Sequence, residues 1–285
     1  MTVSEALKIA TNCLEQKKVP RPKLEGEVLL QETLKLRRAS LFLESARPLN
    51  STEELRFFEV VRQRSEGVPL QYIFGGTVFR QLNLILREGV FIPRSETELL
   101  VEHVLEEIQL RKRVFFLDVG TGSGAIALSL AYEAPQSFGW GLDISDRALR
   151  AAYDNARAHN LEEKVTFAKS DLFQTLNQSL DRVFDVIVSN PPYVSRADIS
   201  LLSPEIKNFE PLHALDGGED GLDFIKKIIQ QGPYYLRKKG LLALEVGFGQ
   251  ARAVKKLLAG SGDFREIRIF KDFSGIERIV LGARA

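Results

Sequence analysis

The residues with the clearest chemical potential form one short segment, Asn190–Tyr193, which follows an apolar stretch at residues 184–189. Its two consecutive prolines fix φ and donate no backbone hydrogen bond, so the turn is stiff and its carbonyl groups point outward. The side-chain oxygen of Asn190 and the backbone carbonyl of Pro191 could then accept both hydrogens of one NH2 group. The ring of Tyr193 could cover a flat substrate. The segment therefore indicates chemistry on a planar amino group, although Asn-Pro-Pro is also an ordinary turn after a strand.

A glycine-rich loop at residues 120–124 supplies the second chemical signal, because it lies between an apolar run and an apolar helical pattern. Glycines let the backbone approach a ligand closely, and the start of the following helix offers unpaired N–H groups. Gly120, Gly122 and Ala125 match the dinucleotide fingerprint in its alanine form. If Gly124 is counted as the third glycine instead, the loop has three glycines that follow an acidic residue, and this pattern suits S-adenosylmethionine. The loop predicts a nucleotide-type site and leaves both cofactors open.

Two aspartates follow the next expected strands. Asp143 could accept both hydroxyls of a ribose, or it could cap the helix expected at residues 145–159. Asp171 could bind an adenine amino group while Leu172 lines the ring, or it could be a plain turn residue. The Asn190–Tyr193 segment separates the two cofactors, because a nicotinamide enzyme does not need a rigid amino-group acceptor there. The chain also has no obvious acid for hydride transfer, so methyl transfer to nitrogen is favoured.

The apolar pattern divides the chain into three parts. Residues 1–69 have apolar residues at helical spacing and predict a small domain of three or four helices, one of them capped at Asn50. Residues 70–92 are β-rich and predict a connector with a hairpin at residues 77–86. Residues 93–285 alternate strands and helices at βαβ spacing, which predicts an α/β domain with a parallel sheet covered on both faces.

The last part is expected to begin with a helix over residues 97–110 and to end with an antiparallel pair of strands. Apolar runs predict the strands of the sheet at residues 114–119, 138–142, 165–168, 183–189, 241–246, 266–270 and 278–281. The cofactor and acceptor residues follow the carboxyl ends of these strands, where open α/β sheets bind ligands. We therefore expect them to share one site.

The composition excludes several classes of protein. Of the 285 residues, 44% are hydrophobic and 27% are charged, and the formal net charge is +1. The chain therefore lacks the excess of basic residues with which proteins bind the phosphate backbone of nucleic acids. Direct binding of nucleic acid is not expected. The single cysteine excludes an intrachain disulfide, and no Cys or His cluster has metal-ligand spacing. Without a signal peptide or an apolar run of ~20 residues, we expect a cytoplasmic monomer with no metal and no membrane contact.

Taken together, the motifs resemble a known family. The glycine loop, Asp143 and Asn190–Tyr193 are similar to those of S-adenosylmethionine-dependent N-methyltransferases. Longer segments narrow the resemblance to the bacterial release factor glutamine methyltransferases, the PrmC/HemK family, and it covers nearly the whole chain. These segments are residues 91–98, 209–215, 217–222 and 277–282.

The resemblance implies a Rossmann-like class I S-adenosylmethionine-dependent methyltransferase fold with a seven-stranded sheet. It implies methylation of the side-chain amide nitrogen (N5) of the glutamine in the Gly-Gly-Gln motif of peptide chain release factors, with S-adenosylhomocysteine as the second product. The matching cofactor-binding positions are Gly120, Thr121, Gly122, Ser123, Gly124, Asp143, Asp171, Leu172 and Asn190. The glutamine-binding positions are Asn190, Pro191, Pro192 and Tyr193, of which Asn190, Pro191 and Tyr193 are expected to be catalytic.

Other substrates stay open at this point. One is a glutamine of a ribosomal protein. Another is adenine in DNA, which also presents a planar NH2 group but would have to be flipped out of the helix. The near-neutral charge counts against DNA, and the intact motifs count against a third alternative, a non-catalytic binding module. Residues 1–69 are expected to bind the protein substrate, although they could instead serve only to cover the core.

Several polar residues have no assigned role from the sequence alone. Arg94 and Glu98, with Thr97 between them, could shape the mouth of the active site or anchor the connector. Glu245 is an acid within an apolar strand and could lie near the cofactor pocket or simply be paired. The three histidines are far apart in the sequence, and we expect solvated or capping roles for them, including His213.

Overall fold

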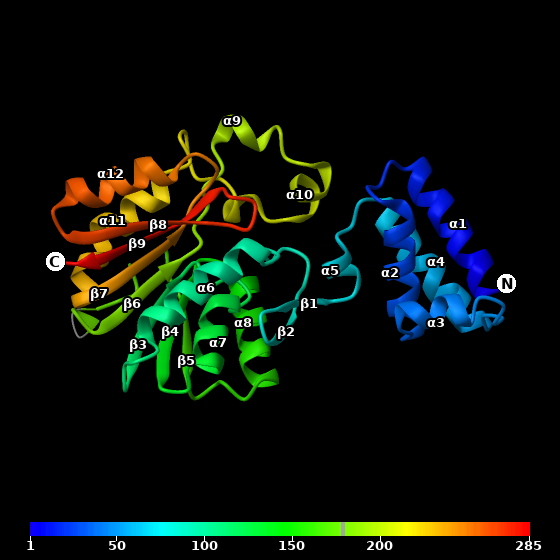
Figure 1. Cartoon of the computed structure of the whole chain (residues 1–285), viewed down its shortest axis with the longest axis horizontal. Coiled ribbons are helices and arrows are strands. Elements are labelled where there is room, and N and C mark those ends of the chain that lie inside the picture. Colours follow the sequence, from blue (N-terminus) through cyan, green and yellow to red (C-terminus); the bar gives the residue numbers. More distant parts are fainter. Residues whose placement is uncertain (178–179) are drawn as a thin grey trace. The chain divides into compact units, whose positions relative to one another are not determined.

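The computed structural model describes residues 1–177 and 180–285 of the chain, and these residues form two compact units. The first unit, Met1–Gly75, is helical, and the second, Gly76–Ala285, contains two sheets and their covering helices. Figure 1 draws the first unit in blue to cyan and the second in the remaining colours. Among the described residues, no helix combines the length and the apolar character needed to cross a membrane.

The first unit is built from helices around its own apolar core. Its helices are α1 (Val3–Gln16), α2 (Pro22–Leu34), α3 (Arg38–Leu43), α4 (Ser51–Ser65) and the short α5 (Leu70–Ile73). The predicted cap of α4 is confirmed, because the side chain of Asn50 accepts from the backbone N–H of Glu53 in a capping box. Buried side chains from α1, α2 and α4, among them Leu14, Leu29 and Phe57, fill the core.

Helix α5 corrects the expectation that the chain becomes β-rich from residue 70. Leu70 and Ile73 are three residues apart, as are apolar residues on one face of a helix, and both pack against the helical core together with Phe74. An extended strand would point neighbouring side chains to opposite faces and could not bury this set on one core. The connector therefore begins with a helical turn.

The predicted hairpin is confirmed and belongs to the second unit. Strand β1 (Gly76–Phe79) pairs antiparallel with β2 (Leu82–Ile85). The side chain of Asn155 accepts from the backbone N–H of Ile85 at 2.6 Å and donates to the carbonyl of the same residue at 3.1 Å. Asn155 lies on α8 (Asp146–Ala158) and is fully buried, so the hairpin is held against the main body of the second unit.

The main sheet of the described structure has seven strands in the order β5-β4-β3-β6-β7-β9-β8 (Figure 1). The strands are β3 (Val114–Val119), β4 (Ser137–Asp143), β5 (Val165–Lys169), β6 (Phe184–Ser189), β7 (Leu236–Glu245), β8 (Phe264–Lys271) and β9 (Glu277–Arg284). All seven expected strands are present, and β9 runs antiparallel to both neighbours, as predicted for the last pair. The strand order reverses between β3 and β6, where α/β sheets open a crevice at the carboxyl ends of the strands.

Helices cover both faces of this sheet (Figure 1). One face carries α6 (Ser95–Ile108), α7 (Ala125–Glu133) and α8, and the other carries α11 (Asp223–Tyr235) and α12 (Ala251–Ser261). Phe116 and Leu117, neighbours on β3, are buried in different clusters, as the alternation of side chains along a strand requires. The short elements α9 (Arg196–Ile199), α10 (Pro204–Phe209) and η2 (Leu212–Ala214) lie in the long connection after β6.

Candidate active site

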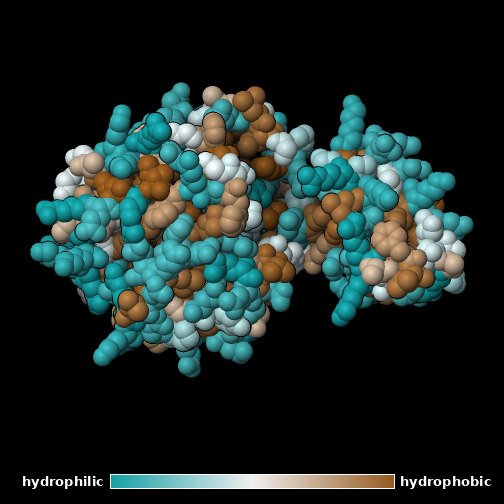
Figure 2. Space-filling model, in the orientation of Figure 1, coloured by the Kyte–Doolittle hydropathy of each residue, from teal (hydrophilic) through white to brown (hydrophobic). Residues whose placement is uncertain are grey.

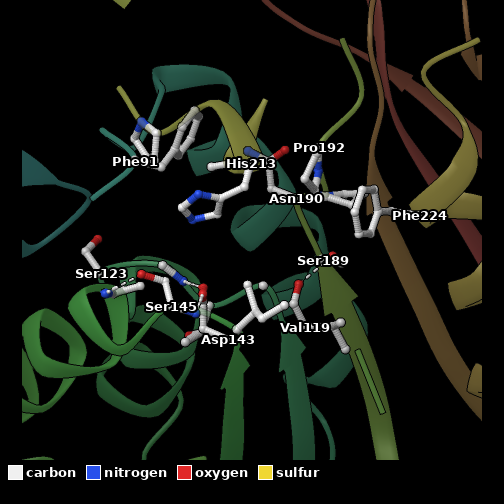
Figure 3. A pocket seen from close by; sticks show the side chains of 18 of the residues that line it. Phe91, Val119, Ser123, Asp143, Ser145, Ser189, Asn190, Pro192, His213 and Phe224 are labelled. Atoms are coloured by element: carbon white, nitrogen blue, oxygen red, sulfur yellow. Dashed lines mark hydrogen bonds between the residues drawn. The ribbon is translucent and has the colours of Figure 1, made fainter. Parts of the chain in front are cut away.

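A cavity of about 290 Å³ lies in the second unit, at the carboxyl ends of β3, β4, β5 and β6. This volume is close to the lower end of small-molecule sites, about 300–1,000 Å³. The cavity brings together most of the residues predicted from the sequence: Gly120, Thr121, Gly122, Ser123, Asp143, Asp171, Leu172, Asn190, Pro191 and Pro192. Two predicted residues, Gly124 and Tyr193, do not line it. Figure 3 shows how the lining side chains face one another.

The glycine loop presents its backbone to the cavity. Gly120 and Gly122 have φ angles of +76° and +57°, which glycine adopts without strain, and both line the cavity. A Cβ added at either position would meet no atom of the described structure within 4 Å, so the space beside them is open. Gly124 instead begins α7, where a Cβ would come within 2.9 Å of a methyl group of Leu128. The first two glycines therefore leave open space in the cavity beside their backbone, and the third allows close packing of the helix.

A buried acid, Asp118, holds this loop from behind. One of its carboxyl oxygens accepts from the hydroxyl of Thr121 at 2.7 Å and from the backbone N–H of Ala127 at 3.2 Å. Its other oxygen has no partner among the described residues. Burial, only partly offset by these hydrogen bonds, raises the pKa of Asp118 to about 7. Asp118 therefore fixes the loop and does not line the cavity.

Asp143 lines the cavity at the end of β4 (Figure 3). Its carboxyl oxygens accept from the backbone N–H groups of Gly122 and Ser145, each at 2.8 Å. Burial raises the pKa of this carboxyl, and the hydrogen bonds from Ser145 and Gly122 lower it. The alternative interpretation of Asp143 as the cap of α8 is wrong, because the hydroxyl of Ser145 caps that helix by accepting from the N–H of Ala148. Asp143 thus fixes the loop while facing the cavity.

Asp171 and Leu172 line the cavity after β5. Leu172 has a φ of +51° and packs partly against the apolar cluster on the α11 side of the sheet. Asp171 is exposed, and its carboxylate accepts from the side chain of Gln174 at 3.3 Å. The pair therefore provides an apolar contact and an accessible carboxylate at the edge of the cavity.

Asn190 belongs to a network of four side chains that the sequence does not connect. Its side-chain nitrogen donates to the hydroxyl oxygen of Thr97 at 3.0 Å, and that hydroxyl donates to Glu245 at 2.7 Å. The hydroxyl of Tyr193 donates to the other oxygen of Glu245 at 3.2 Å. We call these four side chains the acceptor network. Both options considered for Glu245 hold, because it is paired and also lies next to the cavity that Thr97 and Asn190 line.

Burial dominates the electrostatics of the acceptor network. Thr97 and Glu245 are 3% and 1% exposed. Desolvation raises the pKa of Glu245 to about 7, against the lowering effect of the hydrogen bonds from Thr97 and Tyr193. Desolvation, followed by the charge of Glu245, also raises the pKa of Tyr193. The ring of Tyr193 packs against the core, which departs from the expectation that it covers a flat substrate.

Two polar residues at the start of α6, the N-cap Arg94 and Glu98 in the first turn, act as anchors and do not form the mouth of the site. Arg94 forms an ion pair with the buried Glu210 at 2.5 Å, and Glu210 also accepts from the N–H of Ile92 at 3.3 Å. Glu98 accepts from the N–H of Arg80 at 2.9 Å, in the turn of the hairpin. Neither Arg94 nor Glu98 lines the cavity.

Several lining residues were not singled out from the sequence, among them Phe91, Pro93, Ser189, His213 and Phe224. Figure 3 shows the ring of His213 projecting into the cavity above Asp143. Burial raises the pKa of Asp143, and the charge of His213 opposes that rise. The expectation of a solvated or capping role for His213 is therefore incomplete. A signal was available for three of these residues, because Phe91, Pro93 and His213 lie in segments that carried the family resemblance.

The fold and the site together define a class of protein. A family model described as the methyltransferase small domain matches residues 82–203. Solved structures with a similar fold include the hMettl16 catalytic domain in complex with the MAT2A 3'UTR hairpin 6, with a TM-score of 0.55, 17% identity and 81% of each chain covered. A methyltransferase from Pyrococcus furiosus has a TM-score of 0.53 and 16% identity, and the match covers 72% of this chain and 90% of that one. The chain therefore has the Rossmann-like fold of class I methyltransferases.

More similar sequences narrow the class to one family. The model of the PrmC N-terminal domain matches residues 5–75. A release factor glutamine methyltransferase from Thermodesulfovibrio yellowstonii is 40% identical over 90% of this chain and 91% of that protein. Proteins of the same name from Bacillus cereus and Koribacter versatilis are 37% and 38% identical, covering 98% and 100% of this chain and 98% and 99% of their own length. The chain belongs to the family of release factor glutamine methyltransferases.

Proposed function

We propose that this protein methylates the side-chain amide nitrogen (N5) of the glutamine in the Gly-Gly-Gln motif of peptide chain release factors, with S-adenosylmethionine as methyl donor. The observation that carries the proposal is the orientation of Asn190, whose amide nitrogen is bound to Thr97 so that its oxygen can face the cavity. The names of the relatives support a release factor as the protein substrate.

The residues of the cavity fit the proposed cofactor. Gly120 and Gly122 leave open space beside their backbone, and Asp143 retains free lone pairs for hydroxyl groups. Leu172 offers an apolar surface for a ring, with the carboxylate of Asp171 beside it. When bound, S-adenosylmethionine supplies an activated methyl group. The chain's own contribution is to place an acceptor nitrogen beside it and to hold that nitrogen in one orientation.

A glutamine side chain is a poor nucleophile, because the lone pair of its amide nitrogen is delocalised into the carbonyl group, as in a peptide bond. We infer that the side-chain oxygen of Asn190 and the backbone carbonyl of Pro191 accept the two hydrogens of the glutamine NH2 group. These acceptors stabilise the positive charge that develops on the nitrogen. One N–H proton leaves to water after transfer, so no general base is needed in the transfer itself.

The helical first unit is proposed to bind the release factor. It forms a separate compact unit with its own core, and it exposes apolar side chains, including Leu43 at 86% and Leu55 at 74% exposure. Figure 2 shows hydrophobic residues among the hydrophilic surface of this unit as well as on the second. We expect a protein without residues 1–75 to bind S-adenosylhomocysteine normally but not to methylate an intact release factor. Full activity of that shortened protein would refute the assignment.

The proposed reaction is tested by offering methyl-labelled S-adenosylmethionine to three purified substrates in parallel: a release factor, ribosomal proteins and DNA. Label on the release factor, mapped by mass spectrometry to the Gly-Gly-Gln glutamine, is the expected result. A release factor whose motif glutamine is replaced by glutamate serves as the matched control, because it lacks the NH2 group. Label on a ribosomal protein or on adenine, with none on the release factor, would overturn the proposal.

A further inference from the structure

The side-chain amide of Asn190 can be placed in the cavity in two ways that differ by a half turn. In one orientation its oxygen faces the substrate, and in the other its NH2 group does. An NH2 group facing the NH2 group of the substrate could accept no hydrogen and would oppose the developing positive charge. Only one orientation is productive, so the site needs a means of selecting it.

The acceptor network contains such a means, because its hydrogen bonds run in one direction. An ionised Glu245 can only accept hydrogen bonds. The single hydroxyl hydrogen of Thr97 is used in the bond to Glu245 at 2.7 Å, so the hydroxyl oxygen can only accept from Asn190. It does so at 3.0 Å, from the side-chain nitrogen of Asn190. The carboxylate therefore determines, through one hydroxyl group, which end of the amide faces away from the substrate.

Three separated parts of the chain build this arrangement, namely the start of α6, the end of β6 and the end of β7. Thr97 and Glu245 are 148 positions apart in the sequence. Both are buried, and a hydrogen bond is stronger there than at the surface. The hydroxyl of Tyr193 holds the second oxygen of Glu245 at 3.2 Å and so limits its rotation.

We propose that Thr97 and Glu245 are positioning residues that hold the amide of Asn190 with its oxygen toward the substrate. This inference rests on the proposed function, because it explains how the acceptor of that reaction is oriented. It also predicts a selectivity. A substrate side chain must donate two hydrogens to this site, so a glutamate carboxylate is rejected.

The test uses a matched pair of variants at one position. Thr97→Val keeps the shape of the side chain but removes the hydroxyl group, and Thr97→Ser keeps the hydroxyl group. With a release factor as substrate, we expect Thr97→Val to lower kcat by roughly 10- to 100-fold, since the acceptor is no longer held. Thr97→Ser should stay within about threefold of the wild type, and all three proteins should bind S-adenosylhomocysteine with similar Kd.

A second readout does not depend on activity. In the wild type and in Thr97→Ser, the side-chain NH2 signals of Asn190, assigned by their absence in Asn190→Asp, should exchange slowly with solvent. In Thr97→Val they should exchange quickly. If Thr97→Val does not fold, Glu245→Gln replaces it, because a glutamine can donate to Thr97 and so makes both orientations of Asn190 accessible. We then expect reduced protection and an intermediate loss of kcat.

The proposed reaction and the positioning role of Thr97 can be disproved separately. A wild type that transfers no methyl group to release factor would overturn the proposed function, while the exchange experiment would still decide on the role of Thr97. If Thr97→Val is folded and matches Thr97→Ser in kcat and in the protection of Asn190, the positioning role is wrong. A loss of thermal stability in Thr97→Val with unchanged kcat would also reject it and leave Thr97 with a structural role alone.

Discussion

The two sides of the cavity use a similar device to position two different kinds of group. On the cofactor side, the buried carboxyl of Asp118 accepts from the hydroxyl of Thr121. On the acceptor side, the buried carboxyl of Glu245 accepts from the hydroxyl of Thr97. Burial raises the pKa of each carboxyl to about 7. The difference lies in what is held, because Asp118 accepts hydrogen bonds from the glycine loop and the following helix, whereas Glu245 is proposed to hold the side-chain amide of Asn190 through Thr97.

That difference determines how each side should fail. A backbone loop is restrained by the chain on both sides, so the loss of one anchor weakens the loop without reversing any of its groups. A side-chain amide that loses its anchor can turn and present the wrong atoms. Substitutions of the anchor on the cofactor side should therefore mainly change the stability of the protein and its affinity for the cofactor. Damage on the acceptor side should appear mainly in the rate of methyl transfer.

The largest expected effect tests the acceptor side directly. Asn190→Ala removes the oxygen proposed to accept a substrate hydrogen, and we expect kcat to fall about 100- to 1,000-fold. The Kd for S-adenosylhomocysteine, measured by calorimetry, should change by less than about tenfold. Asn160→Gly is the matched control, since Asn160 is an exposed turn residue of the same unit with a φ of +56°. If Asn190→Ala transfers methyl groups as fast as the wild type, Asn190 is not the acceptor, and the proposed difference between the two sides of the cavity is wrong.

The second prediction concerns the cofactor side. Asp118→Ala leaves the hydroxyl of Thr121 and the backbone N–H of Ala127 without their acceptor, at a cost of about 1–3 kcal/mol in the free energy of unfolding for each unpaired donor. Because the glycine loop is loosened, the Kd for S-adenosylhomocysteine should rise roughly tenfold or more. At saturating cofactor, kcat should fall less than in Asn190→Ala.

Asp118→Asn is the control for this effect, because it retains one oxygen that can accept from Thr121. Denaturant unfolding and calorimetric titration of the three proteins separate stability from cofactor binding. If Asp118→Ala binds S-adenosylhomocysteine like the wild type, the loop does not depend on this anchor. The contrast between the two sides would then be wrong.

The parts of the fold that depend on local patterns could be predicted from the sequence. Strand β3 lies at the predicted residues 114–119, because an apolar run with glycines directly after it leaves little freedom in its bounds. Strand β7 begins at Leu236, five residues before the predicted start, because Leu236 pairs with Phe184 across a register shift. That pairing depends on the tertiary structure, and the local sequence pattern does not indicate it.

The same division holds for the site. The glycine loop and the Asn190–Pro192 turn were predictable, because glycine and proline restrict the backbone where they stand. The contacts of Thr97 with Glu245 and Asn190 join distant strands and a helix, so spacing could not reveal them. The packing of Tyr193 into the core could not be predicted for the same reason, since only the folded sheet brings Glu245 beside its hydroxyl.

The third prediction uses pH to separate stability from rate on the acceptor side. The pKa of Glu245 is raised from 4.5 to about 7 by burial and by the charge of Glu96, against the effects of Thr97, Tyr193 and Arg278. The folded protein therefore holds this proton more tightly than the unfolded chain. The resulting stability is fully present below pH 4.5 and is lost as the pH rises through about 7. The network needs the ionised carboxylate, so kcat should instead rise over the same interval.

Glu245→Gln provides the comparison for both trends. Relative to this variant, the free energy of unfolding of the wild type should decrease from about pH 5 to about pH 8. The kcat of the wild type, measured at saturating cofactor, should increase with pH, while that of the variant stays nearly flat. Parallel pH profiles for kcat in the two proteins would show that the ionisation of Glu245 does not control the acceptor.

The smallest expected effect concerns a bond that joins the two sides. The hydroxyl of Ser189, at the end of β6, donates to the backbone carbonyl of Val119, at the end of β3, at 2.6 Å. Ser189→Ala should lower the free energy of unfolding by about 1 kcal/mol. Because each side keeps its own anchor, kcat and the Kd for S-adenosylhomocysteine should each stay within about threefold of the wild type.

Ser129→Ala is the matched control, since Ser129 is fully buried on α7 and its hydroxyl oxygen has no partner among the described residues. Its replacement should leave the free energy of unfolding unchanged or slightly higher, because no hydrogen bond is lost and a polar atom leaves the core. The difference between the two variants measures the link between β3 and β6. If Ser189→Ala lowers kcat as strongly as Thr97→Val, the acceptor depends on the register of β6 as well as on its own network, and the two sides are not independent.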